Sequence, residues 1–295
     1  MLEFYDISMD DQQWVTACLR ASDYRGCEYS FANNMAWRRL HESKIARFAC
    51  FYLCCAFDTE DGVPSFVYPA GEGDHRELIA EMKRFSEAMG KPLRIWNLSP
   101  ARLAWMEETY PDAFTAEAER DSWDYIYNSE DLHHLRGRKY HQKRNFLHRF
   151  AEYGAVSAPL TERDFDDCIT FAAQSYADKL EGDRSGISEQ FAIDTYFRHF
   201  DALGLEGTVL RLDGRLAAFA IGEPLSSDTF CVHIEKADTT LQGAYAAVNQ
   251  AFAAAVSARF PYINREEDLG LEGLRKSKLS YRPAFMQEKY CVTFK

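Results

Sequence analysis

The spacing of apolar residues along this 295-residue chain predicts one order of secondary structure twice. In each half, two segments with the period of an amphipathic helix precede several strand-like runs, and a helix, a strand, a helix and a strand follow. The clearest example is segment 244–256, where Tyr245, Val248, Phe252 and Val256 form one apolar stripe. The halves share no visible identity, so the duplication is inferred from element order alone. This order predicts two mixed α/β units.

The expected elements follow from these patterns and from the turn residues between them. The first half is expected to form helices over 11–20, 34–41, 78–89 and after Pro100, and strands over 45–57, 63–68, 93–98 and 123–127. The second half is expected to form helices over 164–176, 189–203, 244–256 and 270–279, and strands over 207–212, 216–225, 229–237, 261–264 and 285–294.

This is the element order of the GNAT acyltransferase fold. The expected fold class is therefore α/β (α+β), with two tandem GNAT-like units, each a mixed central sheet flanked by helices. The expected division is an N-terminal unit over 1–130, a basic connecting helix over 131–153 and a C-terminal unit over 154–295.

Composition and cysteine placement narrow the class of protein. Hydrophobic residues make up 46% of the chain and charged residues 27%, the proportions of a folded globular protein rather than a disordered one. No apolar run reaches the ~18 residues that a membrane-spanning helix needs, and the acidic segment 1–14 lacks the pattern of a signal peptide. The eight cysteines contain no C-x-x-C pair, which predicts free thiols, a cytoplasmic location and no metal site.

Charge is distributed unevenly along the chain. The net charge is −12, from 34 basic and 46 acidic residues, yet segment 132–151 holds six basic residues and no acidic one. These six are Arg136, Arg138, Lys139, Lys143, Arg144 and Arg149. A second basic cluster consists of Arg275, Lys276, Lys278 and Arg282. Such clusters can hold phosphates or a nucleic-acid backbone despite the overall negative charge, and the alternative is a solvated helix face.

Candidate catalytic residues lie on two of the expected strands. Strand alternation places His233 and Glu235 on one face of segment 229–237, because side chains two residues apart share a face. Asn264 and Glu266 follow the same rule on the next strand. In a GNAT unit these two strands separate and the substrate lies in the gap, so the four side chains are expected to converge on one cleft. The alternatives are a buried structural histidine and a surface acidic cluster.

Five stretches of the sequence resemble a known family. They are YSFANNMAW (29–37), region 124–150 with DLHHLRGRKYHQKRNFLHRF, AFAIGEPLSSDTFCVHIEKAD (218–238), GAYAAVNQAF (243–252) and INREEDLGLEGLRKSKLSYRP (263–283). Across these stretches the chain resembles cytoplasmic proteins related to the C-terminal domain of phosphatidylglycerol lysyltransferase. The resemblance implies a tandem GNAT fold, as in the Fem-type peptidoglycan aminoacyl transferases. It also implies transfer of an amino acid from aminoacyl-tRNA to a lipid or cell-wall acceptor.

The combined prediction is an aminoacyl or acyl transferase whose chemistry lies in the second unit. His233 or Glu235 would act as the base, and Asn264 and Glu266 would orient an amine or hydroxyl acceptor of a small molecule, peptide or lipid head group. The residues expected to bind the donor are Arg138, Lys139, Lys143, Arg144, Asn249, Arg265, Arg275, Lys276, Lys278, Tyr281 and Arg282. The donor is expected to be aminoacyl-tRNA or acyl-CoA, without a further cofactor.

Two alternatives stay open at the level of the sequence. A CoA-dependent N-acyltransferase usually carries a Q/R-x-x-G-x-G/A loop before its long helix, and segment 236–249 contains only Gly243. A non-catalytic RNA- or phospholigand-binding protein of the same fold would use the basic clusters alone. Binding of CoA species, or of tRNA without turnover, distinguishes these alternatives from the aminoacyl transferase.

Overall fold

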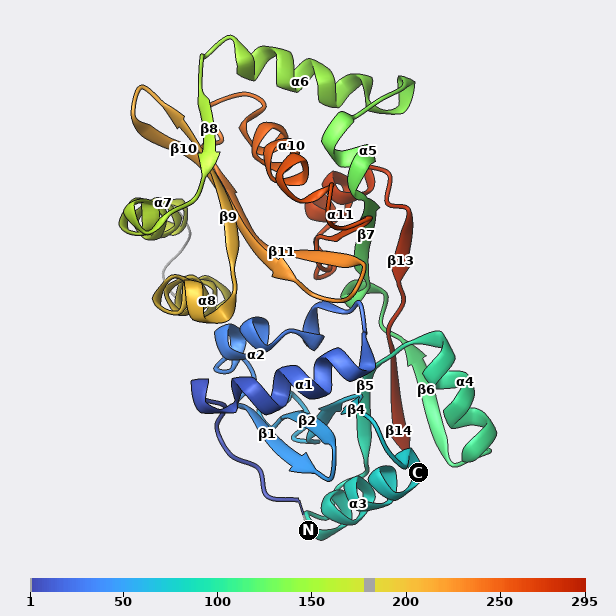
Figure 1. Ribbon diagram of the computed structural model, residues 1–295. Helices are drawn as coiled ribbons and strands as arrows, with labels where there is room; N and C mark the ends of the chain where they lie inside the picture. The colour runs from blue at the N-terminus through green and yellow to red at the C-terminus, as the bar shows by residue number, and fades with distance from the viewer. Residues whose placement is uncertain (1, 178–183) are drawn as a thin grey trace. The chain divides into compact units, whose positions relative to one another are not determined.

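The computed structural model describes residues 2–177 and 184–295 (Figure 1). The chain forms two compact units that are not contiguous in sequence. The first contains the residues up to Asp124 together with Glu267–Gly270 and Gln287–Lys295, and the second contains Tyr125–Glu266 and Leu271–Met286. This division differs from the expected segments 1–130, 131–153 and 154–295, because the basic segment belongs to the second unit and the end of the chain belongs to the first.

A seven-stranded mixed sheet forms the first unit, in the order β1–β2–β3–β5–β14–β6 with β4 paired to β2. Its strands are β1 (Ser43–Phe48), β2 (Phe51–Ala56), β3 (Ser65–Val67), β4 (Ala70–Gly71), β5 (Arg94–Leu98), β6 (Phe114–Ala118) and β14 (Tyr290–Phe294). Its helices are α1 (Gln12–Ser22), α2 (Phe31–Trp37), α3 (His75–Ala88) and α4 (Pro100–Thr109), with 3-10 turns η1 (Met9–Asp11), η2 (Cys27–Tyr29) and η3 (Arg120–Ser122). Leu78, Ile79 and Met82 of α3 are buried against Phe66 and Ile95, so the apolar stripe that predicts this helix is its buried face.

The second unit contains another seven-stranded mixed sheet, in the order β13–β7–β12–β11–β10–β9–β8. Its strands are β7 (Asp124–Asn128), β8 (Val156–Pro159), β9 (Glu206–Leu212), β10 (Arg215–Pro224), β11 (Thr229–Ala237), β12 (Tyr262–Asn264) and β13 (Phe285–Gln287). Its helices are α5 (Ser129–His134), α6 (His141–Ala151), α7 (Phe165–Ala177), α8 (Arg184–Arg198), α9 (Phe200–Leu203), α10 (Ala244–Val256) and α11 (Glu272–Leu279), with η4 (Arg138–Tyr140) and η5 (Glu162–Asp164). Within the described residues, no helix combines the length and apolar character needed to cross a membrane.

Helix α10 and the pair α7–α8 cover opposite faces of the second sheet (Figure 1). On β10, Ala218 and Ala220 belong to the core that contains Phe252 of α10. Between them, Phe219 contacts Phe197 of α8, with ring centroids 5.9 Å apart. This alternation of faces is the period of two expected along a strand.

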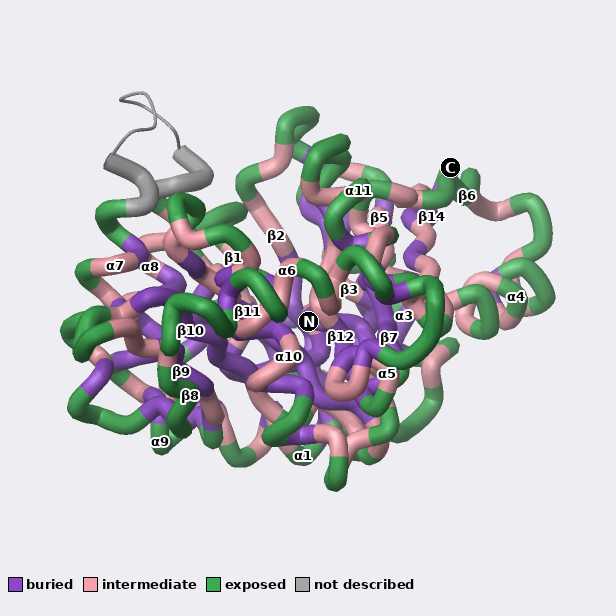
Figure 2. Tube along the Cα trace, turned by 90° about the horizontal axis from the view of Figure 1, so that it is seen from above, coloured by how far each residue is buried: buried purple, intermediate pink, exposed green. Residues whose placement is uncertain are grey.

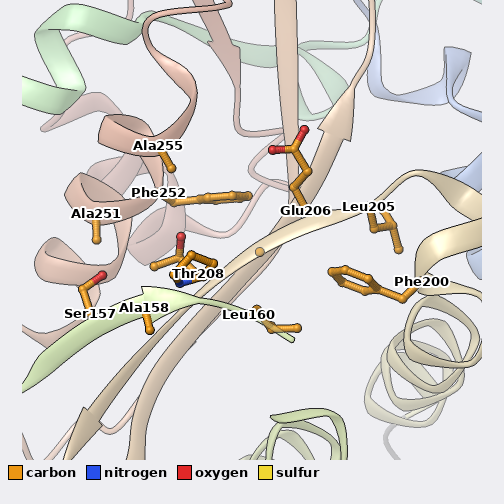
Figure 3. A pocket seen from close by; sticks show the side chains of 12 residues that line it. Ser157, Ala158, Leu160, Phe200, Leu205, Glu206, Thr208, Ala251, Phe252 and Ala255 are labelled. Carbon is orange, nitrogen blue, oxygen red and sulfur yellow. The ribbon is translucent and has the colours of Figure 1, made fainter. Parts of the chain in front are cut away.

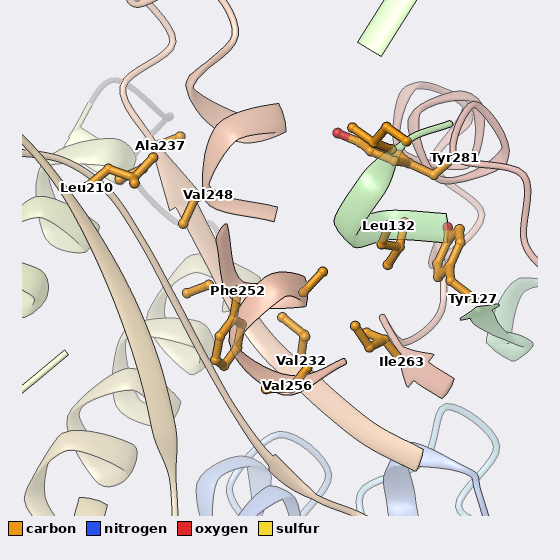
Figure 4. Close-up of a cluster of buried hydrophobic side chains, with 14 of the residues drawn as sticks. Tyr127, Leu132, Leu210, Val232, Ala237, Val248, Phe252, Val256, Ile263 and Tyr281 are labelled. Carbon is orange, nitrogen blue, oxygen red and sulfur yellow. The ribbon is translucent and has the colours of Figure 1, made fainter. Parts of the chain in front are cut away.

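The core of the second unit lies between α10 and the sheet (Figure 4). Phe252 packs edge-on against Phe230 of β11, with ring centroids 5.3 Å apart. Val248 and Val256 of α10 lie in the same buried cluster as Ile263 of β12. Full burial of a side chain of this kind contributes ~1.5–3 kcal/mol. Strands β10 and β11 are buried along most of their length (Figure 2), so they form a packed support for polar residues at their ends.

Two strands lie in a different sheet from the one that their place in the sequence predicts. β7 comes from the first half but lies between β12 and β13 in the second sheet. The final strand, expected as one element over 285–294, is divided: β13 pairs with β7, and β14 runs antiparallel to β5 and β6 of the first sheet. Both β7 and β14 thereby have a neighbour on each edge, which pairs their backbone hydrogen-bonding groups.

Three local expectations also differ from the structure. The strand expected over 45–57 is the hairpin β1–β2, which turns at Ala49, a residue with φ of 50°. The helix expected over 189–203 is interrupted at His199, which separates α8 from α9. Strand β6 is an additional edge strand whose residues are mostly exposed, so its apolar pattern is weak.

Candidate functional site

The two central strands of the second sheet separate at one end. β11 pairs in parallel with β12 only over Thr229–Cys231, opposite Tyr262–Asn264. Beyond Cys231, β11 continues to Ala237 with β10 as its partner. The pairing thus ends where the strand before the long helix is expected to separate from the strand after it.

A β-bulge in β11 changes which side chains share a face. Ile234 pairs with Ile221 and Val232 pairs with Gly222, which leaves His233 as an extra residue. Val232 is buried in the core beneath α10. His233 stacks on Tyr196 of α8, with ring centroids 5.3 Å apart. The alternation of side chains between the two faces of the sheet therefore shifts by one residue at the bulge.

The bulge overturns the expectation that His233 and Glu235 lie on one face and converge on one cleft. Glu235 contacts Asn249 of α10, whereas His233 lies on the side of α8. The expectation assumes a strict period of two, and an inserted residue shifts this period by one. The predicted catalytic residues consequently belong to two separate clusters.

The first of these, the Arg265 cluster, contains Glu235, Asn249, Arg265, Lys143 and Tyr281. Nε of Arg265 donates to Oε2 of Glu235 over 3.1 Å, and its Nη2 also contacts this oxygen. Nδ2 of Asn249 donates to Oε1 of Glu235 over 3.0 Å. Both oxygens of the Glu235 carboxylate are thus engaged, and the guanidinium is held in a fixed orientation.

Two buried polar atoms of the Arg265 cluster have no hydrogen-bond partner in the part of the chain that the structure describes. They are Nη1 of Arg265, a donor, and Oδ1 of Asn249, an acceptor. The Asn249 residue is 3% exposed, and the Arg265 side chain is 11% exposed. Because buried polar groups are nearly always hydrogen-bonded, such atoms are suited to contact a ligand.

Lys143 of α6 completes this cluster. Its Nζ lies 3.6 Å from the centroid of the Tyr281 ring, and Cζ of Arg265 lies 4.9 Å from the same centroid. Burial and the nearby Arg265 charge lower the pKa of Lys143 to about 8, although Glu235 acts in the opposite direction. A substantial fraction of this amine is therefore neutral near physiological pH.

The second group, the His233 cluster, contains Cys231, His233, Glu266, Glu223 and Tyr196. Nδ1 of His233 lies 2.8 Å from Oε1 of Glu266, and its Nε2 lies 3.1 Å from Oε1 of Glu223. Burial opposes the imidazolium, but Tyr196, Cys231 and the hydrogen bond to Glu223 outweigh it, so the pKa of His233 lies well above its usual value. Burial also raises the pKa of Tyr196. The His233 side chain has no exposed surface.

Asn264 positions Glu266. Oδ1 of Asn264, a fully buried residue, accepts a hydrogen bond from the backbone N–H of Glu266 over 2.7 Å. Glu266 has φ of 57°, a left-handed conformation that is unfavourable for a residue with this side chain. The turn directs consecutive side chains to different clusters: Arg265 joins Glu235, and Glu266 joins His233.

The predicted basic residues divide into those in the Arg265 cluster and those elsewhere. Lys143 belongs to the cluster, and Nζ of Lys278 donates to the backbone carbonyl of Arg265 over 2.6 Å. Lys139 pairs with Asp131 over 2.9 Å, and Nη1 of Arg144 donates to the carbonyl of Gly137 over 2.7 Å. The remaining predicted residues lie on η4, on α11 or just after it: Arg138, Arg275, Lys276 and Arg282.

Glu223 and Tyr196 were outside the sequence prediction. The one local signal for Glu223 is a charged residue within the apolar strand 216–225. Tyr196 shows no signal of its own, because its contact with His233 joins residues on α8 and β11. Both are found only when the packing of distant segments is known.

A cavity of 410 Å³ lies elsewhere in the second unit, between β8, β9 and α10 (Figure 3). Its lining is largely apolar, with Leu160, Phe200, Leu205 and Phe252, and with Glu206 at its edge. The lining contains none of the predicted site residues.

The start of α10 is tightly enclosed. Gly243, with φ of 96°, precedes the helix, and a Cβ at this position would lie 2.3 Å from the carbonyl oxygen of Phe146. The backbone of α6 therefore lies directly against the first turn of α10. In this fold class, a helix start of this kind is the usual place for a pyrophosphate to bind.

Comparison with known proteins identifies relatives of the whole chain. Residues 19–293 match the family model described as phosphatidylglycerol lysyltransferase, C-terminal. A conserved protein of unknown function from Bacteroides thetaiotaomicron VPI-5482 is 34% identical, with a TM-score of 0.92 and 100% of each chain covered. No curated protein matches the chain.

Two structures of lower identity share the fold. The C-terminal domain of a putative lysylphosphatidylglycerol synthetase from Agrobacterium fabrum is 13% identical, with a TM-score of 0.64 over 96% of this chain and 92% of that chain. FemX is 10% identical, with a TM-score of 0.65 over 99% of this chain and 97% of that chain. These likenesses confirm the predicted fold of two GNAT-like units, and the family match over residues 19–293 confirms the resemblance predicted from the sequence.

Proposed function

The chain belongs to the family of phosphatidylglycerol lysyltransferase C-terminal domains, and on this premise we propose that it transfers an aminoacyl group from an ester donor, aminoacyl-tRNA, to an amine or hydroxyl acceptor. The proposal rests on one observation above all. In the Arg265 cluster, an amine with a lowered pKa and a guanidinium with an unpartnered N–H lie against the same Tyr281 ring. These are the two groups that acyl transfer requires, a base and an oxyanion donor.

Lys143 is the proposed base. With a pKa of about 8, roughly one amine in ten is neutral at pH 7, far more than for an exposed lysine. The neutral amine of Lys143 takes a proton from the ammonium or hydroxyl group of the acceptor, which leaves a lone pair on that nitrogen or oxygen for attack on the carbonyl carbon. General-base assistance of this kind accelerates a reaction by about 10²–10⁴-fold.

Arg265 is the proposed oxyanion donor. As the acceptor nitrogen or oxygen bonds to the carbonyl carbon, Nη1 of Arg265 donates to the oxygen that becomes negative. The carbon–oxygen bond to the ribose of the donor then breaks, and Lys143 returns its proton to the ribose oxygen. Glu235 and Asn249 hold the guanidinium in place, which makes them positioning residues.

His233, Glu235 and Asn264 have supporting roles in this mechanism. His233 has no exposed side-chain surface and a carboxylate on each ring nitrogen, so it supports Glu266 rather than contacting substrate. Glu235 is already bonded through both oxygens, which disfavours it as a base. Asn264 shapes the turn that carries Arg265 and Glu266.

Two observations favour aminoacyl-tRNA over acyl-CoA as the donor. The resemblance to this family implies an aminoacyl-tRNA donor. In addition, the contact between Gly243 and the α6 backbone leaves little space for a CoA pyrophosphate at the start of α10. The exposed basic residues on η4 and α11, Arg138 and Lys276, are proposed to contact the phosphates of tRNA.

A single-turnover transfer assay tests this function. Bulk tRNA is charged in turn with individual labelled amino acids and mixed with the protein and either phosphatidylglycerol vesicles or a small primary amine. We expect acceptor-dependent loss of label from one class of charged tRNA. Lys143→Met should abolish this transfer, and Lys44→Met, which removes a lysine paired with Asp6 at the surface of the first unit, should retain it.

Binding measurements on the same protein distinguish this function from a CoA-dependent acyltransferase and from an RNA-binding protein. Stabilisation by acetyl-CoA or CoA in a thermal-shift measurement, followed by acyl transfer to an amine, would replace the proposal with a CoA-dependent acyltransferase. Equal binding of charged and uncharged tRNA without turnover would instead show an RNA-binding protein.

A further inference from the structure

We propose that the His233 cluster is a binding site for a divalent transition-metal ion such as Zn²⁺, with Cys231, His233 and Glu266 as ligands and Glu223 behind them. This inference is independent of the transfer chemistry, since it concerns the opposite face of the sheet. The sequence predicts no metal site, because the ligands come from β11 and from the turn after β12 and lack a recognisable spacing. The structure brings them together.

The three ligand atoms lie within 4.8 Å of one another, and the two distances to sulfur match the spacing of a metal site. Sγ of Cys231 lies 3.7 Å from Nδ1 of His233 and 3.9 Å from Oε1 of Glu266, and the latter two atoms lie 2.8 Å apart. A tetrahedral zinc ion, with bonds of ~2.3 Å to sulfur and ~2.1 Å to nitrogen or oxygen, holds its ligand atoms roughly 3.5 Å apart. A small rotation of the Glu266 carboxylate away from His233 would admit the ion.

The chemistry of the donors favours zinc over the alkaline-earth ions. A thiolate, an imidazole and a carboxylate together suit Zn²⁺, whereas Mg²⁺ and Ca²⁺ prefer oxygen ligands alone. Three protein ligands leave a fourth tetrahedral position for water or another group.

Glu223 supplies the outer hydrogen bond that histidine ligands typically have. Its Oε1 lies 3.1 Å from Nε2 of His233, so once an ion replaces the proton on Nδ1, Glu223 would accept a hydrogen bond from the N–H that remains on Nε2. Tyr196 stacks on the imidazole at an angle of 12° and restricts its rotation. The ring is therefore oriented before any ion binds.

The backbone is distorted at two of the ligand positions. The bulge in β11 turns His233 away from α10, and Glu266 adopts a positive φ of 57° stabilised by Asn264. Both distortions are unfavourable by themselves and direct side chains toward one point. The carboxylate side chains of Glu223 and Glu266 are 13% and 19% exposed, which provides a route of entry.

The other two clusters of potential ligands within residues 2–177 and 184–295 lack these features. In the first unit, Nζ of Lys289 lies 2.7 Å from Asp124 and 3.8 Å from Cys27, so an ammonium occupies the place of an ion. In the second unit, Nδ1 of His133 is bonded to Ser257 at 3.1 Å.

Cobalt substitution tests the proposal. The full chain is treated with a chelator, exchanged into buffer and titrated with Co²⁺. We expect one equivalent to bind with the visible bands of a tetrahedral ion and a near-ultraviolet thiolate-to-cobalt charge-transfer band, and Zn²⁺ should then displace it. Failure to bind, or binding without the charge-transfer band, would overturn the proposal.

Substitutions of individual residues show which side chains bind the ion. Cys231→Ser should remove the charge-transfer band, whereas Cys50→Ser, which changes an exposed cysteine, should leave it intact. The reverse result would place the ion elsewhere and overturn the proposal. Glu223→Gln should weaken Co²⁺ binding by about 10–100-fold while the band persists. Because the band of the unmodified protein already reports the thiolate, the test holds even if Cys231→Ser fails to fold.

Discussion

Arg265 and Glu266 are adjacent in sequence, yet their side chains engage opposite faces of the second sheet. Arg265 bonds to Glu235 beside α10, and Glu266 lies 2.8 Å from His233 on the side of α8. The positive φ of Glu266 produces this divergence at the end of β12. One short turn thus supports both the Arg265 cluster and the His233 cluster, which makes their separate contributions measurable by substitutions on either side.

Arg265→Lys should reduce the rate of aminoacyl transfer by about 10²–10³-fold, as measured in a single-turnover assay. A lysine keeps the charge but cannot bond to Glu235 and to the developing oxyanion in the fixed geometry of a guanidinium. Arg259→Lys is the matched control, because Arg259 pairs with Glu206 at the surface. Equal rates for the two variants would rule out Arg265 as the oxyanion donor.

The rate of transfer should rise about tenfold per pH unit below the pKa of Lys143, about 8, and level off above it. The rate rises with pH because the neutral amine is the active form of Lys143, and its fraction grows as the pH rises. Arg265, Glu235 and Tyr281 surround this amine, and the pKa of Tyr281 is raised to about 12, so the tyrosine stays neutral over this range. A pH-independent rate would contradict Lys143 as the base.

The sequence predicts the repeated element order and the separation of β11 from β12. The apolar run of β11 and the apolar stripe of α10 identify these elements because both pack into the core, but neither pattern carries information about an inserted residue. The bulge at His233 therefore escaped prediction, and with it the separation of His233 from Glu235. Glu223 was missed for a related reason, since its contact depends on how β10 and β11 align.

Lys143→Met should stabilise the protein at pH 7, because it removes an ammonium that burial disfavours. The pKa is about 8 in the folded protein against an ordinary value of 10.5, so the unfolded chain binds more protons between these values. The wild-type protein consequently gains stability relative to the variant as pH rises from about 8 to about 10.5. Urea denaturation of both proteins at several pH values measures this difference, and a constant difference would contradict the lowered pKa.

Lys289→Met should destabilise the first unit by about 3–5 kcal/mol. Nζ of Lys289 lies 2.7 Å from Asp124, and the two side chains are 2% and 0% exposed. Glu28, whose side chain is 21% exposed, also pairs with this ammonium, so removal of the ammonium leaves the buried Asp124 and the partly buried Glu28 without this cation. Lys44→Met is the control, since Lys44 and Asp6 form an exposed pair at 3.6 Å and its loss should alter unfolding by less than ~1 kcal/mol. Similar urea midpoints for both variants would show that the buried pair contributes little.

Gly243→Ala should lower both stability and transfer activity, whereas Gly154→Ala should have a smaller effect on stability alone. Both glycines have positive φ, 96° and 74°, so both substitutions carry the ~1–2 kcal/mol disadvantage of a left-handed residue. Only at Gly243 would the new methyl lie 2.3 Å from a backbone oxygen, that of Phe146, because nothing lies within 4 Å of the corresponding position at Gly154. Relief of that clash requires α6 to shift, and α6 carries Lys143 to the Tyr281 ring. Urea denaturation and single-turnover transfer of both variants separate these effects, and equal losses would show that the contact between α6 and α10 does not position Lys143.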